Sequence, residues 1–441
     1  MKILVYSGSY ALNNLGDVAM LQVAVSRLRA SWPEADVHVL TSSPELLSRH
    51  CPGAIPVPSN GLRKWLEWSR VPGRARVPRA VSRRLARNDA RFRDHLPAVS
   101  DGLALRWGRI HPSDHADVEA FLGVVNAANF LVLGGGGYIT DLFRGQARSS
   151  LELLSRFQRR QVPTAMLGQG IGPLSHPVLL SRAREVFPRV GVIGVREGLS
   201  TLPFLASIGV VRKQIRVTGD DAIEPAFAVR PERLGAFLGV NVRVSSYSNV
   251  GVGALEDVRR ALRNAAEAVG AAFRPVPIST AAGDSDVQSL RELLPDAFAS
   301  DAPENVDTPL ALMHRVGECR VVVTGSYHAG VFALAQGIPV VGLTRSSYYT
   351  DKFRGLEDQF GGGCRVVSLD QPAIVEVLSA SVQDLWREAD ERRPALLSAA
   401  ARQIQESQAA YASLRSLVDV RPPAGATLSA LAGRVVDEPH S

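Results

Sequence analysis

Short apolar runs alternate with helical patterns along the first half of the chain. Residues 3–6 form a predicted buried strand, and the apolar positions of residues 17–30 recur at the spacing of a helix. Further short strands, separated by helical stretches, are predicted at residues 37–40, 130–133, 164–167, 190–194 and 215–217. Such alternation is typical of a parallel sheet that helices cover on both faces.

The pattern restarts after a turn-rich segment, residues 224–233, which is the predicted linker. Strands are then expected at residues 238–244, 273–278, 321–324 and 340–343, and helices at 254–269, 286–294, 309–316 and 328–336. We therefore predict an α/β protein with two Rossmann-like domains, residues 1–228 and 229–420, and a ligand cleft between them.

The C-terminal part of the chain is expected to differ from both domains. Residues 382–418 have the composition of a long helix, broken near Pro394, which can pack back across both domains. Prolines, glycines and other small residues dominate residues 421–441. This last segment is predicted to be a flexible tail.

Composition favours a folded cytoplasmic protein. The chain has 441 residues, which is more than one ordinary hydrophobic core holds. Of these residues 46% are apolar and 21% charged, the usual balance of a folded globular protein. No apolar run approaches the roughly 20 residues that span a bilayer, and the first residues lack the apolar stretch of a secretory signal. Cys51, Cys319 and Cys364 are widely spaced and odd in number, which argues against a disulfide framework or a metal site.

Most of the formal charge of +7 comes from arginine, concentrated in a basic insertion at about residues 60–112. This insertion also carries Trp65, Trp68 and Trp107. Its arginines include Arg63, Arg70, Arg74, Arg76, Arg79, Arg83, Arg84, Arg87, Arg91, Arg93 and Arg109. One interpretation is a solvated insertion; the other is a basic, aromatic surface for peripheral contact with the inner membrane face or for a phosphorylated acceptor. No nucleic-acid-binding motif accompanies the charge, so nucleic acid is not expected as a partner.

Candidate functional residues follow the strands, because ligands of open α/β sheets bind beyond the carboxyl ends of the strands. Asn14, Gly16 and Asp17 follow the first strand and open a helix, whose exposed amides attract anions. Asp17 has two interpretations. It complements the helix dipole, or it serves as a base at the mouth of the cleft.

Glycines follow two further predicted strands. Residues 134–137 are four consecutive glycines, among which Gly135 and Gly136 are candidate ligand contacts because they leave the backbone bare. Gln169 and Gly170 follow the strand at 164–167 and add an amide side chain. The spacing is not that of a dinucleotide-binding loop, so no such cofactor is predicted.

Basic residues complete the candidate set. Arg196 follows the strand at 190–194, where a guanidinium can clamp a carboxylate or phosphate. The alternative is a surface ion pair with Glu197 or another neighbour. His328 begins a helix after Ser326 and Tyr327, where the helix dipole lowers its pKa. A lone histidine is usually structural, but the glycine-rich turn before it and the downstream basic residues favour function here. These basic residues are Arg345 and Lys352.

Catalysis by a covalent serine or by a metal is not predicted. The sequence lacks a Ser-His-Asp order, an HExxH motif, a phosphate-binding P-loop and a carboxylate cluster for a metal ion.

Taken together, the strings after the strands resemble those of the polysaccharide pyruvyl transferase family, in the family's order over roughly residues 1–360. They are Asn13-Asn14-Leu15-Gly16-Asp17, the glycines 134–137, Gly168-Gln169-Gly170-Ile171-Gly172-Pro173-Leu174, Val195-Arg196-Glu197 with Ser200, Thr218-Gly219-Asp220, Asp307-Thr308-Pro309, the His328 region with Gly337-Ile338-Pro339, and Lys352. The resemblance implies a GT-B-like fold. It also implies transfer of a pyruvyl group from phosphoenolpyruvate to a sugar diol of a glycan or lipid-linked precursor, which gives a cyclic ketal and phosphate without a cofactor.

The resemblance also implies roles for residues. Arg196, His328 and Lys352 would contact the donor, with His328 as the acid that protonates its carbon and Asp17 as the candidate base for a sugar hydroxyl. The family usually has Arg-x-His where this chain has Ser326-Tyr327-His328. Arg345 or Arg243 is therefore the candidate replacement for that arginine.

Two other functions remain open at this level. One is a GT-B-type glycosyltransferase that uses a nucleotide-sugar, and the other is a degenerate, non-catalytic glycan-binding member of the family. Ser326 in place of the usual arginine is the best support for the second of these.

Overall fold

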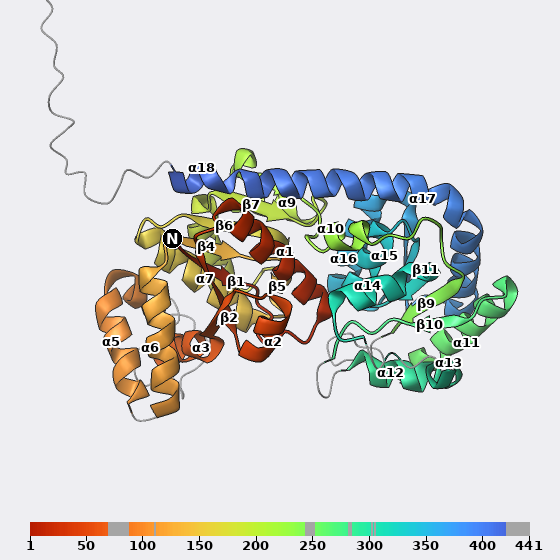
Figure 1. Ribbon diagram of the computed structural model, residues 1–441, viewed down its shortest axis with the longest axis horizontal. Helices are drawn as coiled ribbons and strands as arrows, with labels where there is room; N and C mark the ends of the chain where they lie inside the picture. Colours follow the sequence, from red (N-terminus) through yellow and green to blue (C-terminus); the bar gives the residue numbers. More distant parts are fainter. Residues whose placement is uncertain are drawn as a thin grey trace, which may run out of the picture.

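The computed structural model describes residues 1–68, 88–109, 112–242, 252–280, 285–300, 303 and 306–419. Two parallel β-sheets lie in separate halves of the molecule, and helices cover both (Figure 1). The predicted α/β architecture with two Rossmann-like domains is confirmed. Arg243, the tail at 421–441 and the arginines between residues 69 and 87 lie outside the described residues.

The first sheet has the strand order β3-β2-β1-β4-β6-β7-β8, and β5 pairs with β6. Its strands are β1 (Lys2–Tyr6), β2 (Asp36–Thr41), β3 (Ile55–Pro58), β4 (Phe130–Leu133), β5 (Gly136–Ile139), β6 (Thr164–Ile171), β7 (Val192–Val195) and β8 (Ile215–Val217). Its helices are α1 (Leu15–Ser31), α2 (Pro44–His50), α3 (Ser59–Trp68), α5 (Pro97–Gly108), α6 (Pro112–Ala127), α7 (Arg144–Arg159), α8 (Pro177–Val186), α9 (Thr201–Ser207) and α10 (Ile223–Ala228). The strand order reverses between β1 and β4, so the loops after these two strands open a crevice at the sheet edge.

The second sheet has the order β10-β9-β11-β12-β13, and the order reverses between β9 and β11. Its strands are β9 (Phe237–Asn241), β10 (Phe273–Pro275), β11 (Cys319–Thr324), β12 (Val340–Thr344) and β13 (Cys364–Ser368). Its helices are α11 (Val252–Val269), α12 (Asp286–Leu293), α13 (Pro295–Ser300), α14 (Pro309–Gly317), α15 (Tyr327–Ala335) and α16 (Ser347–Phe360), followed by α17 (Ile374–Ala412) and α18 (Leu414–Asp419).

The segment predicted as a linker is partly helical. Helix α10 occupies its first residues, and Ala226 is buried in the apolar core of the second half. A domain boundary near residue 228 stays a prediction, because that same core also includes Leu15 and Met20 of α1.

The described part of the basic insertion is not simply solvated. Trp65 is 2% exposed and donates a hydrogen bond to Asp101 over 3.0 Å, and Arg93 is buried against Glu152 at 3.2 Å. Only Trp107 of the three tryptophans is largely exposed, at 48%. The interpretation of a solvated insertion is therefore wrong for Trp65 and Arg93, whereas Arg63, Arg91, Arg106 and Arg109 are exposed. No helix among the described residues combines the length and apolar character needed to cross a bilayer.

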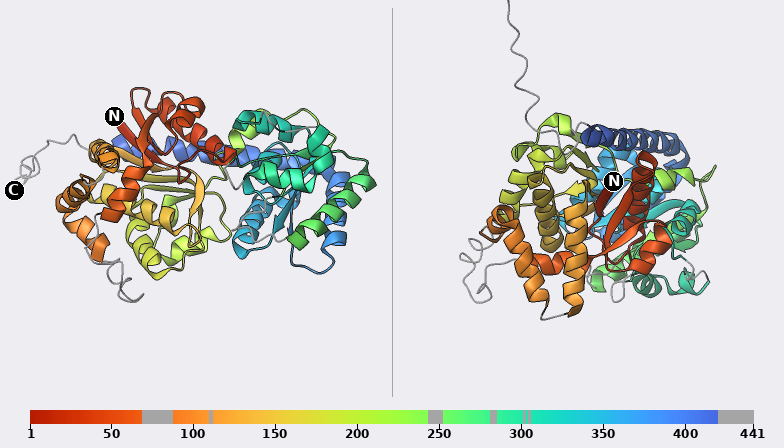
Figure 2. Two further views of the ribbon diagram at one scale, coloured as in Figure 1. Left: turned by 90° about the horizontal axis from the view of Figure 1, so that it is seen from below. Right: turned by 60° about the vertical axis from the view of Figure 1, so that its left-hand side comes forward.

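Helix α17 returns from the second half to the first, as the views in Figures 1 and 2 show. The predicted break at Pro394 is wrong, since the helix continues through it, and Figure 1 shows a bend in its course instead. Near its end, Ser407 and Tyr411 donate hydrogen bonds to the buried carboxylate of Asp221, at 2.7 and 2.8 Å. These bonds attach the helix beside the last strand of the first sheet.

The bond from Tyr411 to Asp221 predicts a measurable loss of stability in Tyr411→Phe. Its removal leaves a buried carboxylate oxygen without its donor, which costs about 1–3 kcal/mol of the free energy of unfolding. Thermal denaturation should show a lower midpoint for this variant. Ser416→Ala changes an exposed residue on α18 and is the control; equal midpoints for the two variants would disprove the attachment.

Candidate active site

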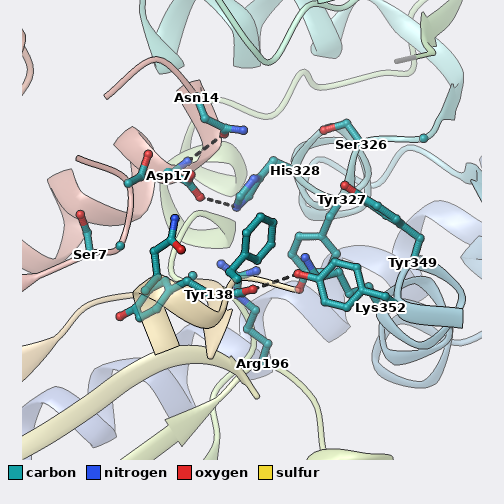
Figure 3. A pocket seen from close by; sticks show the side chains of 18 residues that line it. Ser7, Asn14, Asp17, Tyr138, Arg196, Ser326, Tyr327, His328, Tyr349 and Lys352 are labelled. Atoms are coloured by element: carbon teal, nitrogen blue, oxygen red, sulfur yellow. Dashed lines mark hydrogen bonds and ion pairs between the residues drawn. The ribbon is translucent and has the colours of Figure 1, made fainter. Parts of the chain in front are cut away.

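A cavity of about 240 Å³ lies between the two halves, at the carboxyl ends of both sheets. Figure 3 shows the labelled side chains converging on it from both halves. Its lining residues are Ser7, Gly8, Ser9, Asn14, Asp17, Gly136, Gly137, Tyr138, Phe143, Gln146, Arg196, Gly325, Ser326, Tyr327, His328, Tyr348, Tyr349 and Lys352. A second cavity of about 150 Å³ adjoins it and shares Arg196, Tyr327, Tyr348 and Lys352.

The start of α1 lies directly against His328. The side chain of Asn14 caps this helix by accepting hydrogen bonds from the backbone amides of Gly16 and Asp17. A side-chain carbon on Gly16 would lie 2.0 Å from Cγ of His328, so glycine permits this contact between the two halves. Asp17 faces the same ring, with 3.9 Å between its Oδ1 and Nε2 of His328.

Three buried side chains that can carry a charge, those of Arg196, Asp220 and His328, lie close to one another. Nε of Arg196 lies 2.9 Å from Oδ2 of Asp220, and Nε2 of His328 lies 3.7 Å from the same oxygen. Burial raises the pKa of Asp220 to about 6, although Arg196 opposes the shift. Burial, together with the positive charges of Arg196 and Lys352, lowers the pKa of His328 well below its ordinary value. The helix dipole invoked from the sequence acts in the same direction.

Lys352 supplies a second cation from α16. Its ammonium lies 4.2 Å from the ring centre of Tyr348, whose hydroxyl donates to the carbonyl of Gly137 over 2.9 Å. Arg196 lies over Tyr327 at 4.9 Å, so aromatic faces support both cations. Burial, reinforced by Arg196, lowers the pKa of Lys352 to about 7. The site therefore holds a lysine whose charge is sensitive to pH near neutrality.

Most of the residues predicted from the sequence meet at this cavity. His328, Asp17, Asn14, Gly136, Arg196, Ser326, Tyr327 and Lys352 line it. Gly16 lies beneath His328, and Gly170 lines the adjoining cavity. Glu197 is not the partner of Arg196, because its carboxylate accepts hydrogen bonds from Ser200 and Thr201 at the start of α9.

Three predicted contacts do not line either cavity. Gly135 packs against Met20, and Gln169 is fully buried, where it donates hydrogen bonds to the carbonyls of Leu133 and Gly134. Gln169 and Gly170 lie within β6, which is longer than predicted, because β5 adds its hydrogen bonds there. Arg345 instead forms an ion pair with Asp370 at 3.0 Å, so its assignment as the replacement arginine is wrong.

Several residues of the site were not among the predicted site residues. Asp220 lies behind the cavity, three residues after the end of β8, so its position near a strand end was the available signal. Tyr348 lies four residues before the predicted Lys352 on α16, which places both on one helix face. Ser7, Phe143 and Gln146 belong to none of the sequence motifs described above, so no signal in the sequence indicated them. In the part of the chain that the structure describes, no cluster of three His, Cys, Asp or Glu side chains suits a metal ion.

Comparison with solved structures places this fold among GT-B-like proteins. A candidate UDP-N-acetylglucosamine 2-epimerase from Listeria monocytogenes superposes with a TM-score of 0.57 at 11% identity, covering 96% of this chain and 97% of that one. The UDP-GlcNAc 2-epimerase from Neisseria meningitidis, solved with UDP-GlcNAc bound, gives a TM-score of 0.52 at 10% identity. The superposition covers 95% of this chain and 100% of that one. These likenesses show a shared fold. No curated protein matches the chain in sequence.

The family is established by a different comparison. The family model described as polysaccharide pyruvyl transferase matches residues 14–347. This range is most of the chain and includes the start of α1, Arg196, Asp220 and His328. The chain belongs to the polysaccharide pyruvyl transferase family.

The contact between Gly16 and His328 predicts that Gly16→Ala is destabilising. Its methyl group would overlap the imidazole, and the repacking should cost about 1–3 kcal/mol of the free energy of unfolding. The matched control is Gly123→Ala on α6, where the structure shows open space and alanine should stabilise the helix by about 0.5–1 kcal/mol. Thermal denaturation distinguishes them, and a stable Gly16→Ala protein would contradict the contact.

Proposed function

We propose that this protein transfers the pyruvyl group of phosphoenolpyruvate to two hydroxyls of one sugar, as part of building a polysaccharide or glycan precursor. The observation that carries the proposal is the cavity in which Arg196, Lys352 and His328 meet Asp17. Phosphoenolpyruvate carries a phosphate and a carboxylate, and its enol carbon must be protonated. Two cations, a histidine and a carboxylate are the groups that this reaction requires.

The cations define where the donor binds. A small dianion placed between Arg196 and Lys352 gains charge-assisted hydrogen bonds in a buried site, where such bonds are strong. The cavity is also lined by bare backbone at Gly136 and Gly137, which lets an anionic group approach the main chain closely. Ser326, where the family usually has an arginine, leaves Lys352 as the second cation of the donor site.

The reaction balances without water or a cofactor. A proton added to C3 of phosphoenolpyruvate makes a methyl group and leaves C2 electrophilic. One sugar hydroxyl forms a bond to C2; the bond from C2 to the phosphate oxygen then breaks, and the second hydroxyl closes the ketal. One hydroxyl proton replaces the proton given to C3, and the other leaves with the phosphate.

In the proposed mechanism, His328 and the neighbouring carboxylates donate and accept these protons. In the empty site the imidazole is neutral, because burial and two cations lower its pKa. The negative charge of the donor opposes those cations and raises the pKa of His328, so that it takes up a proton where the donor binds. Asp220 at 3.7 Å stabilises the imidazolium, and Asp17 accepts a proton from the sugar hydroxyl.

The acceptor is proposed to be a sugar of a glycan precursor. A lipid-linked precursor would bring the reaction to the inner face of a membrane. Exposed Trp107 and its basic neighbours Arg106 and Arg109 support such peripheral contact.

Calorimetry with phosphoenolpyruvate and with UDP-N-acetylglucosamine tests the donor. We expect phosphoenolpyruvate to bind and Arg196→Met to weaken it by about 10- to 150-fold, the loss of one charge-assisted interaction. Arg196→Lys, which keeps the charge, should lose less. Arg345→Met is the control with unchanged affinity, because Arg345 lies outside the cavity. Binding of the nucleotide-sugar alone would reject the proposal in favour of a glycosyltransferase, and binding of neither would favour a non-catalytic member.

The lowered pKa of Lys352 predicts how donor affinity depends on pH. Lysine is cationic below its pKa, so its contribution to donor affinity should be full only below about pH 7. Affinity should fall by up to about tenfold per pH unit above the pKa of the free lysine, about 7, and level off above the pKa of the donor-bound lysine. The range from pH 7.5 to 9.5 is informative, because a phosphate monoester with a second pKa near 6 is fully ionised there. Lys352→Arg keeps its charge and should give a shallower profile, whose remaining slope comes from proton uptake by His328. A profile as steep as that of the wild type in this variant would contradict the assignment to Lys352.

A further inference from the structure

Helix α5 exposes an apolar face at the outer edge of the molecule. Leu96, Val99 and Trp107 are 50%, 51% and 48% exposed, and Leu103 between them is partly exposed. The intervals of three, four and four residues place these side chains along one side of the helix. Figures 1 and 2 show α5 at the end of the first half that lies away from the second half, so this face is remote from the cavity between the halves.

The exposed residues of α5 differ from those of an ordinary surface helix. None of them carries a carboxylate, an amide or a hydroxyl; they are Pro97, Ala98, Val99, Gly102, Arg106 and Trp107. The neighbouring helix α6, which packs against α5, exposes Ser113, Glu119 and Asn126 in the usual way. A helix that exposes apolar side chains where polar ones are expected marks an interaction surface.

Positive charge borders this apolar face. Arg106 follows Leu103 by three residues and so lies on the same side of the helix, and Arg109 stands at the C-terminal end of the helix. Neither arginine forms an ion pair with the described residues. Asp101 is the one carboxylate of α5, but it is buried and pairs with Arg156 at 2.6 Å. The exposed side of α5 therefore combines apolar side chains with charge of one sign.

A lipid bilayer with negatively charged headgroups matches both properties. Apolar side chains of an amphipathic helix enter the boundary between headgroups and acyl chains, where a tryptophan ring is also favoured. Arginines beside them gain attraction to anionic phosphates. Because α5 lies at an outer edge of the molecule, its partner must adapt to a projecting helix, as a fluid bilayer does.

We infer that the face of α5 formed by Leu96, Val99, Leu103, Arg106 and Trp107 binds the surface of a bilayer that contains anionic phospholipids. This inference deepens the proposed function, on which it rests for a lipid-linked acceptor. It adds the helix that makes the contact, the depth to which it enters the lipid and the charge of the lipid that it prefers.

The test measures how the full-length protein binds to vesicles in a sedimentation assay. The vesicles are phosphatidylcholine alone, or phosphatidylcholine with about one third phosphatidylglycerol, and we expect about 10- to 30-fold tighter binding to the mixed vesicles. Trp107→Ser should weaken binding to the mixed vesicles by about tenfold and Val99→Ser by about threefold, because each removes apolar surface from the lipid. Arg106→Gln should weaken it by about fivefold.

Matched variants separate this surface from general effects of apolar or basic residues. Leu310→Ser removes a side chain that is 53% exposed on α14, and Arg233→Gln removes an exposed arginine; both should bind mixed vesicles like the wild type. All of the α5 variants should keep the wild-type melting temperature, because the changed side chains are exposed.

Three results would overturn the inference. They are no binding to mixed vesicles, equal binding to both kinds of vesicle, and α5 variants that bind as tightly as the wild type. Sedimentation velocity without lipid tests a second copy of the chain as the occupant, and a dimer that Trp107→Ser abolishes would replace the bilayer with that copy. The vesicle assay contains no phosphoenolpyruvate, so its failure leaves the proposed donor chemistry standing. Failure of phosphoenolpyruvate to bind the wild type, in turn, overturns that chemistry and not the vesicle result.

Discussion

Two adjacent buried aspartates after β8 hold the two halves and the site together. Asp221 accepts hydrogen bonds from Ser407 and Tyr411 near the end of α17, and so attaches the returning helix to the first sheet. Asp220, one residue earlier, lies against Arg196 and His328, which line the cavity. Since the two carboxylates share one short turn, the attachment of α17 and the placement of the charged side chains depend on the same stretch of backbone.

The buried site brings acidic and basic side chains close together. Burial raises the pKa of Asp220 and lowers those of His328 and Lys352, so each of the three groups carries its charge less readily than it would in water. Such a cluster responds strongly to a ligand that carries its own charge. Arg196 stays cationic, because Asp220 and its other anionic neighbours outweigh the effect of burial.

Much of the architecture could be read from local patterns. The strands at 130–133 and 215–217 begin and end as predicted, because a short apolar run bounded by turns leaves little choice in a buried parallel sheet. Pro394 shows the limit of such reasoning, since packing along α17 holds the helix together across a residue that disfavours it locally. Trp65 and Arg93 show another limit: their composition suggested a solvated surface, but Asp101 and Glu152, distant in sequence, provide buried partners.

The sequence by itself determined which residues stand at strand ends, and this was enough to find His328, Arg196 and Asp17, because the carboxyl edge of a parallel sheet is a property of local order along the chain. Only the tertiary structure decided which of these face one another. Arg345 also follows a strand, β12, but pairs with Asp370 instead of reaching the cavity. Ser7, which no motif marks, is among the residues that line the cavity. The reason is physical: charge pairing and burial depend on neighbours that the fold brings together, whether in one half, as for Arg345 and Asp370, or across both halves, as for Asp17 and His328.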